Sequence, residues 1–219
     1  AQVAEGMAEI SRAGFGEAET LAMITPVLQT ASIEHMSLAE ASKIVTAAIN
    51  QFNLTAADAP HITDLITKAS VISATSVRNL GTALGYVGTL STMFGRSAQE
   101  TLAVLSGLAK GGIDAARGGT GLRAVMQGLV QDVPKHTRVL KEMGLTYAQI
   151  DPSKVGLIGA LQVLKNANLD NSRAFALFRA NAATAAMTMI NNLDVIQKYN
   201  LALNDAEGTT QRMALTATN

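Results

Sequence analysis

The stretch KGGIDAARGGTGLRAVMQGL, residues 110–129, contains six of the chain's 18 glycines and decides how two helices are joined. Glycine is suited to end a helix, because it adopts the left-handed conformation found there at little steric cost. We expect one helix to end at Gly111 and Gly112 and the next to begin with Thr120 as its N-cap, with IDAAR (113–117) as the connection between them. The predicted structural corner consists of Gly111, Gly112, Gly118, Gly119, Thr120, Gly121, Leu122 and Arg123.

A glycine-rich loop before a helix is also typical of phosphate-binding sites. The P-loop pattern needs a lysine after its second glycine, and here Gly119 stands in that place. The dinucleotide pattern is matched literally by Gly119, Gly121 and Ala124, but it requires a preceding strand. Residues 98–110 have helical spacing instead, so we interpret the stretch as a corner and predict no cofactor and no cofactor-binding residues.

The same kind of corner recurs along the chain. FNLTAAD (52–58), FGRSAQE (94–100) and MGLTYAQ (143–149) each place Gly or Asn after an apolar residue, and Ser or Thr two positions later. Gly or Asn ends a helix, and Ser or Thr with an acid or amide three residues further on forms the capping box that begins another. SLAE (37–40) adds a further helix start.

Between these corners the apolar residues follow helical spacing, and no segment alternates with a period of two. The sequence therefore predicts an all-α fold, a multi-helix module of short antiparallel helices joined by Gly/Asn and capping-box corners. The expected helices span residues 2–12, 17–34, 38–51, 56–74, 77–93, 98–110, 120–131, 135–143, 156–166 and 172–198. Pro26 falls inside the second of them and predicts a break or kink.

Three regions are predicted. Residues 1–14 form an N-terminal helix that continues an upstream segment, residues 15–200 form the all-α core, and residues 201–219 form a polar tail that frays. The charge-free run between Arg78 and Arg96 contains several polar residues and is interpreted as a buried helix rather than a membrane span.

Composition narrows the range of functions. Aromatic residues make up 4% of the chain, Trp and Cys are absent, and the formal net charge is zero. The core must therefore be built from Ala, Leu, Ile, Val and Met, and Cys-based metal or nucleophilic sites are excluded. Because a dedicated nucleic-acid surface would give a basic excess, no specific nucleic-acid site is predicted.

No pattern of catalytic or metal-binding residues is found. His35, His61 and His136 are far apart, and Asp58, His61 and Asp64 are interpreted as one solvated helix face rather than a metal site. The basic stripe of Lys135, Arg138 and Lys141 is likewise interpreted as solvated. We predict no catalytic residue and no metal site, and therefore that the chain is not an enzyme.

The segment SAQETLAVLSGLAKGGIDAARGGTGLRAVMQGL, residues 97–129, resembles the core region of phage tail tape-measure proteins, including the corner that opens its second helix. Gly118 replaces the family's commoner Ala there. Residues 50–70 are similar to an upstream segment of the family, with Asp64 at its aspartate, and residues 139–164 and 176–190 resemble later segments. Arg179 stands where the family has a glycine. The resemblance covers roughly residues 15–192.

The resemblance implies a structural protein of a phage or prophage tail, located in the lumen of the virion tail and, during assembly, in the host bacterial cytoplasm. Such proteins set the length of the tail tube and leave it ahead of the DNA. The implied partners are the tail-tube protein, tail-assembly chaperones, tail-tip or baseplate proteins, further copies of the same chain inside the tube, and the host membrane on ejection. The alternatives are a non-viral helical scaffold or adaptor protein without catalytic activity and, less favoured, a cell-wall hydrolase.

Overall fold

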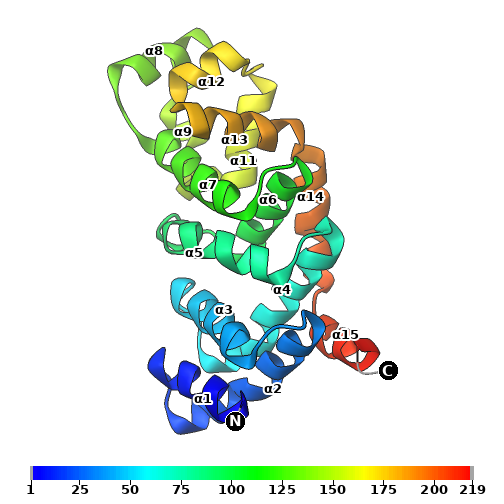
Figure 1. Cartoon of the computed structure of the whole chain (residues 1–219). Coiled ribbons are helices and arrows are strands. Elements are labelled where there is room, and N and C mark those ends of the chain that lie inside the picture. Colours follow the sequence, from blue (N-terminus) through cyan, green and yellow to red (C-terminus); the bar gives the residue numbers. More distant parts are fainter. Residues whose placement is uncertain (1, 218–219) are drawn as a thin grey trace.

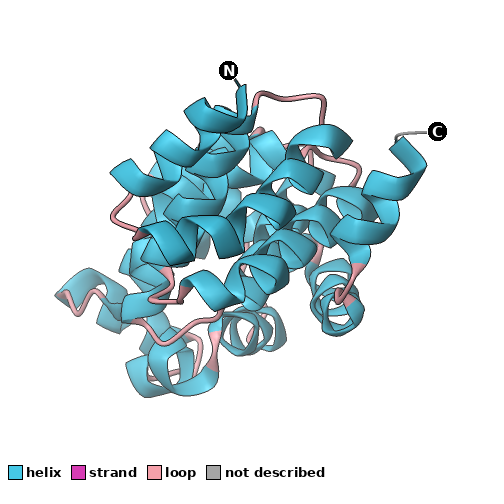
Figure 2. Cartoon of the chain, turned by 90° about the horizontal axis from the view of Figure 1, so that it is seen from below, coloured by secondary structure: helices cyan, strands magenta, loops and turns pink. Residues whose placement is uncertain are grey.

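The computed structural model describes residues 2–217, and within them the chain is helical throughout, without a strand (Figure 2). The prediction of an all-α fold is confirmed. The α-helices are α1 (Gln2–Arg12), α2 (Glu17–Ile33), α3 (Leu38–Gln51), α4 (Ala59–Ser73), α5 (Val77–Met93), α6 (Ala98–Lys110), α7 (Ala115–Val130), α8 (Pro134–Glu142), α9 (Tyr147–Ile150), α10 (Pro152–Val155), α11 (Leu157–Asn166), α12 (Asn171–Leu177), α13 (Ala180–Asn191), α14 (Leu193–Ala202) and α15 (Thr209–Ala217). Two short 3₁₀ helices, η1 (Ala56–Asp58) and η2 (Leu203–Asp205), precede α4 and follow α14.

The helices stack in two rows (Figure 1). One row, which we call the odd row, runs α1, α3, α5, α7 and α13, each packed on the next. The other, the even row, runs α15, α2, α4, α6 and α14. The chain climbs through both rows from α1 to α7, forms the upper end with α8 to α12, and returns along the even row, so α15 lies beside α2 and α4.

Eight corners in residues 2–217 share one geometry. In each, a residue with positive φ ends a helix, and the N-cap of the next helix follows two positions later. At the corner of residues 52–58, Asn53 has a φ of 53°, the Leu54 N–H donates to the Ile49 carbonyl at 2.9 Å, and Thr55 forms a capping box with Asp58. This 6→1 bond and cap satisfy groups that a helix end leaves free. In these eight corners the residues with positive φ are Gly14, His35, Asn53, Ala74, Gly95, Gly112, Gly144 and Asn168.

Two expected features differ in the structure. The helix expected over 172–198 is divided into α12, α13 and α14. The extended backbone of Phe178 and Arg179 separates α12 from α13, and the non-helical backbone of Asn192 separates α13 from α14. The Phe178 side chain is buried beside Gly128 of α7, a tertiary contact that the helical spacing does not reveal. Pro26 does not break α2, which continues to Ile33 with Pro26 buried in the core.

The polar tail expected from residue 201 is also ordered as far as it is described. Residues 209–217 form α15, and Thr209 and Thr210 at its start are buried. The reason lies on α4, where the buried carboxylate of Asp64 accepts hydrogen bonds from the backbone N–H groups of Gly208 at 2.7 Å and Thr210 at 2.8 Å. Asp64 therefore caps a helix that lies far from it in the sequence.

Two other carboxylates cap distant helices in the same way. Glu34 at the end of α2 accepts from the Val77 N–H at 3.1 Å, and Glu100 of α6 accepts from the Ile158 N–H at 3.0 Å. Local caps form the corners, and these three long-range caps fix helices against one another. A carboxylate at a helix N-terminus is also favoured by the helix dipole.

Replacing Asp64 with Ala should lower the free energy of unfolding by about 1–3 kcal/mol, because two N–H groups near α15 would lose their acceptor in a buried setting. Urea unfolding measures this loss, and trypsin cleavage at Arg212 should become faster as α15 loosens. The control is Asp194→Ala, which removes only an exposed ion pair with Lys165 and should have a much smaller effect. Equal effects of the two substitutions would show that Asp64 does not anchor α15.

Candidate functional site

The glycine-rich stretch forms the end of α6 and most of α7. Gly111 follows the last residue of α6, and Gly112 has a φ of 81° while the Ile113 N–H donates to the Leu108 carbonyl. The N-cap of α7 is Asp114, whose carboxylate accepts from the Arg117 N–H at 3.0 Å. The helix thus begins at the predicted connection IDAAR rather than after it.

Thr120 is therefore not an N-cap, and that prediction was wrong. It lies in the second turn of α7, where its hydroxyl donates to the Ala116 carbonyl at 2.8 Å. Gly118, Gly119 and Gly121 lie inside the helix, and none of them has a positive φ. Leu122 is fully buried, whereas Arg123 points to solvent.

The glycines inside α7 allow other helices to approach its backbone. A Cβ atom on Gly119 would lie 2.4 Å from the Ala83 carbonyl oxygen of α5, a distance that real Cβ atoms do not show. A Cβ on Gly121 would lie 2.8 Å from the Cβ of Ala185 on α13. Gly119 and Gly121 thus admit the two helices that flank α7 in the odd row, and both are required for contact rather than for turning the chain.

The same device is used at other places in both rows. Gly81 of α5 lies against Ile44 of α3, and Gly107 of α6 lies against Ile196 of α14, each with no room for a Cβ atom. Gly118 is an exception, since the nearest atoms to its Cβ position are 3.9 and 4.0 Å away. In the sequence, such a contact is indicated by a glycine inside a segment with helical apolar spacing, because glycine destabilises a helix there unless a close contact requires it.

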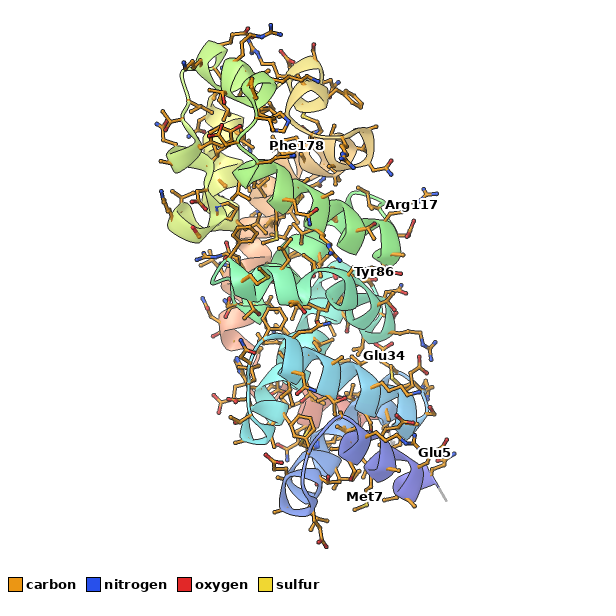
Figure 3. All side chains as sticks on the ribbon, turned by 90° about the vertical axis from the view of Figure 1, so that its left-hand side faces the viewer. Glu5, Met7, Glu34, Tyr86, Arg117 and Phe178 are labelled. Carbon is orange, nitrogen blue, oxygen red and sulfur yellow. The ribbon has the colours of Figure 1, made fainter. Side chains whose placement is uncertain are left out.

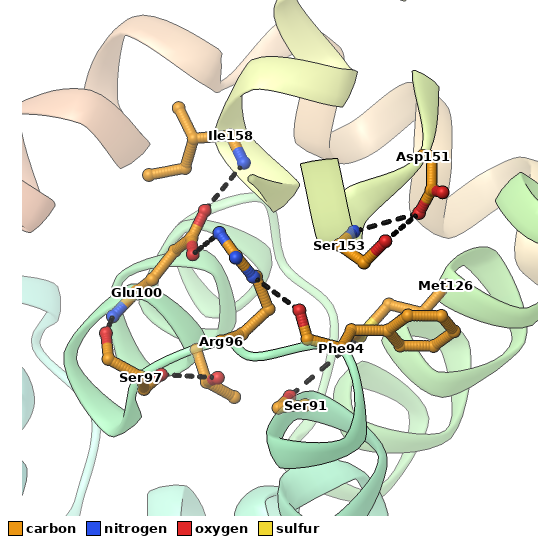
Figure 4. Close-up of polar contacts among 10 residues, drawn as sticks. Ser91, Phe94, Arg96, Ser97, Glu100, Met126, Asp151, Ser153 and Ile158 are labelled. Carbon is orange, nitrogen blue, oxygen red and sulfur yellow. Dashed lines mark hydrogen bonds and ion pairs between the residues drawn. The ribbon is translucent and has the colours of Figure 1, made fainter. Parts of the chain in front are cut away.

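A polar network joins the corner before α6 to the upper helices (Figure 4). Ser97 caps α6 by accepting from the Glu100 N–H at 3.1 Å, and Glu100 in turn pairs with Arg96 at 3.3 Å. The Arg96 Nε donates to the Phe94 carbonyl at 3.0 Å. Together with the Glu100 bond to Ile158, these contacts fix the start of α11 on α6.

Asp151, close to this network, caps the short helix α10. Burial opposes ionisation of Asp151, but hydrogen bonds from Ser153 and the charge of Lys154 outweigh it and keep its pKa below the usual value. Within the odd row, a hydrogen bond from Arg78 lowers the pKa of Glu40, and this pair links α5 to α3. Both carboxylates act as structural acceptors.

The structure separates the remaining candidate residues. Asp64 is buried, which corrects the interpretation of Asp58, His61 and Asp64 as one solvated face. Asp64 holds the start of α15 through its two hydrogen bonds, a role that sequence reasoning missed. His35 is one of the corner residues with positive φ, and His61 and His136 lie on other helices.

Neither a metal cluster nor a membrane span is seen in the described part of the chain. Across residues 2–217, no three His, Asp or Glu side chains lie together in a way that could hold a metal ion. Within the same residues, no helix combines the length and apolar character needed to cross a bilayer.

A groove of about 880 Å³ lies between the end of α7, the start of α8 and the junction of α12 with α13. We call it the α7–α12 groove. Its apolar lining includes Leu90, Phe94 and Phe178, and its rim includes Lys135 and Arg179. No sequence pattern indicates this groove, because its walls come from segments as far apart as Leu90 and Ala182.

Two neighbouring glycines of α7 give a direct test of close packing. Gly119→Ala should lower the free energy of unfolding by about 1–3 kcal/mol, because the new methyl group meets the backbone of α5. Gly118→Ala has room for the methyl group and should raise stability by up to about 1 kcal/mol through helix propensity. Thermal and urea unfolding measure both, and a stable Gly119→Ala variant would contradict the proposed contact.

Comparison with known proteins places these features in a family. The sequence profile described as Phage-related minor tail protein matches residues 1–179. The chain is also similar to a protein named Tape measure protein from Pneumococcus phage Dp-1, with 22% identity over 222 residues. That alignment covers 98% of this chain but only 19% of the relative, so the chain spans about a fifth of its length. No solved structure matches.

The profile match extends over both rows up to the junction before α13, and it includes the glycine-rich helix and the corners that define the fold. A match over more than half of the chain establishes the relationship. The chain belongs to the family of phage-related minor tail proteins, which are structural components of phage tails.

Proposed function

We propose that this chain is a compact helical module of a tape-measure protein, a protein that sets the length of the tail tube during assembly and leaves it ahead of the DNA. The observation that carries the proposal is the alignment of nearly the whole chain with a fifth of a protein named Tape measure protein. The resemblance of residues 97–129 to the core of that family supports it.

The fold supports the view that this module is a compact part of such a protein. A continuous helix of 219 residues would be roughly 330 Å long at 1.5 Å per residue. The corners instead fold the chain back repeatedly, and its accessible surface of 10146 Å² is near the value of about 9,600 Å² for a compact monomer of this mass. We therefore infer that longer helical stretches outside this module perform most of the length measurement.

The proposal also names partners and places. As part of a tape-measure protein, the module would lie in the lumen of the tail tube, with the tail-tube protein around it and tip or baseplate proteins at one end. Tail-assembly chaperones would bind the protein in the host cytoplasm before the tube forms. The neutral chain and its structural use of carboxylates support a scaffolding role rather than catalysis.

The compact form can be measured in solution. Small-angle scattering of the 219-residue chain should give a radius of gyration near ~17 Å, the value for a compact domain of this length. A profile of a rod several times longer would overturn the inference that this module is compact.

Tail length tests the role itself. In a phage whose tape-measure gene carries this segment, in-frame removal of residues 15–200 should shorten the tail much less than removal of equally many residues from a continuous helical region elsewhere, which should shorten it by roughly 280 Å. Duplication of residues 15–200 should lengthen the tail by a correspondingly small amount. Electron microscopy measures the tails, and equal changes for the two regions would contradict the proposed division of labour.

A further inference from the structure

The two ends of the helical stack carry opposite charge. Residues 2–36, which include α1 and α2, contain five carboxylates and a single arginine, a net charge of −4. Residues 115–179, from α7 to the junction before α13, contain nine Lys and Arg and four carboxylates, a net charge of +5. Figure 3 shows Glu5 and Met7 at one end of the stack and Phe178 toward the other.

The basic end carries the α7–α12 groove, and the groove is apolar inside. Phe178 is buried, whereas Val130 and Phe175 along its walls have exposed fractions of 38% and 54%. Large apolar side chains that remain exposed around a hollow are a common sign of a binding surface. With about 880 Å³, the groove has room for a row of side chains from a helix.

The rim of this groove favours an acidic partner. Lys135, His136 and Arg179 line it, and no Asp or Glu does so among the described residues. In residues 2–217, neither Lys135 nor Arg179 forms an ion pair with a carboxylate of its own chain. Their charges are therefore available to a ligand.

A helix with the complementary character lies at the acidic end. On α2, Leu21 and Leu28 have exposed fractions of 56% and 41%, and Ile24 between them is half-buried. Residues at this spacing share one face of a helix, and Glu17 extends the same face by one turn. We call Glu17, Leu21, Ile24 and Leu28 the α2 stripe.

We propose that the α2 stripe of one copy binds in the α7–α12 groove of a second copy. Leu21 and Leu28 would lie among the exposed apolar side chains of the groove, and Glu17 would lie near its basic rim. The apolar contact would supply affinity, and the opposite charges would set orientation and speed association. Since the two surfaces are different, the contact is heterologous and joins copies head to tail, in a ring or a filament.

The contact is a property of the folded chain and does not depend on the proposed role in tail length. Sedimentation velocity of the 219-residue chain should show species larger than a monomer as concentration rises, and fewer of them at high salt, because salt screens the charges. A chain that stays monomeric at low salt would overturn the proposed contact and leave the tail-length proposal standing.

Two variants separate the surfaces. The stripe variant Leu21→Gln/Leu28→Gln and the groove variant Val130→Gln/Phe175→Gln should each lower the association constant about tenfold or more, since each removes two apolar side chains from the contact. All four positions are exposed, so circular dichroism should show unchanged folding. A matched control, Val71→Gln/Leu201→Gln, changes exposed apolar residues elsewhere and should associate like the unmodified chain.

Mixing the two variants gives the decisive result. The stripe variant keeps an intact groove and the groove variant keeps an intact stripe, so together they should form a 1:1 pair that cannot grow further. A contact between identical surfaces would not be restored by mixing. Absence of the pair, or a stripe variant that associates as well as the unmodified chain, would overturn the proposal.

Discussion

The close approach of α7 to α5 is the contact on which the upper part of the stack depends. At Gly119 the backbones of the two helices meet so closely that a single methyl group has no room, because Ala83 presents its carbonyl oxygen there. On the other side of α7, Gly121 admits α13 in the same way. The helix α7 therefore joins α5, which comes before it in the chain, to α13, which comes after it, because it has glycine on the two faces that they contact.

This contact explains a composition that would otherwise be unfavourable. Glycine inside a helix costs about 1 kcal/mol relative to alanine, and α7 contains four glycines. A core nearly free of large aromatics cannot fill wide gaps, so the helices must lie close together, and small residues at the contacts permit this. The buried alanines of α13, Ala182, Ala183, Ala185 and Ala186, serve the same purpose.

The local parts of the fold could be predicted from the sequence, because a corner is encoded within about seven residues. The start of α3 follows from Ser37, and the junction of α5 with α6 follows from Gly95 and Ser97, whereas the left-handed His35 and Ala74 do not fit the Gly/Asn pattern. The start of α7 was misjudged, because Gly118 to Gly121 suggested a corner while Asp114 already provided a cap. Helical glycine and corner glycine are alike in sequence and differ in the structure, in backbone φ and in their neighbours in space.

Apart from the start of α7, the features that sequence reasoning missed join residues that are far apart along the chain. Asp64 and α15 are separated by more than 140 residues, and the break at Phe178 follows from its place beside Gly128. The α7–α12 groove is lined by residues on both sides of that break, together with residues of α5, α7 and α8. A buried acid, an interrupted helix and a hollow thus share one property: each depends on contacts that form only when the chain folds back on its earlier helices, and the residues that make these contacts carry no local pattern of their own.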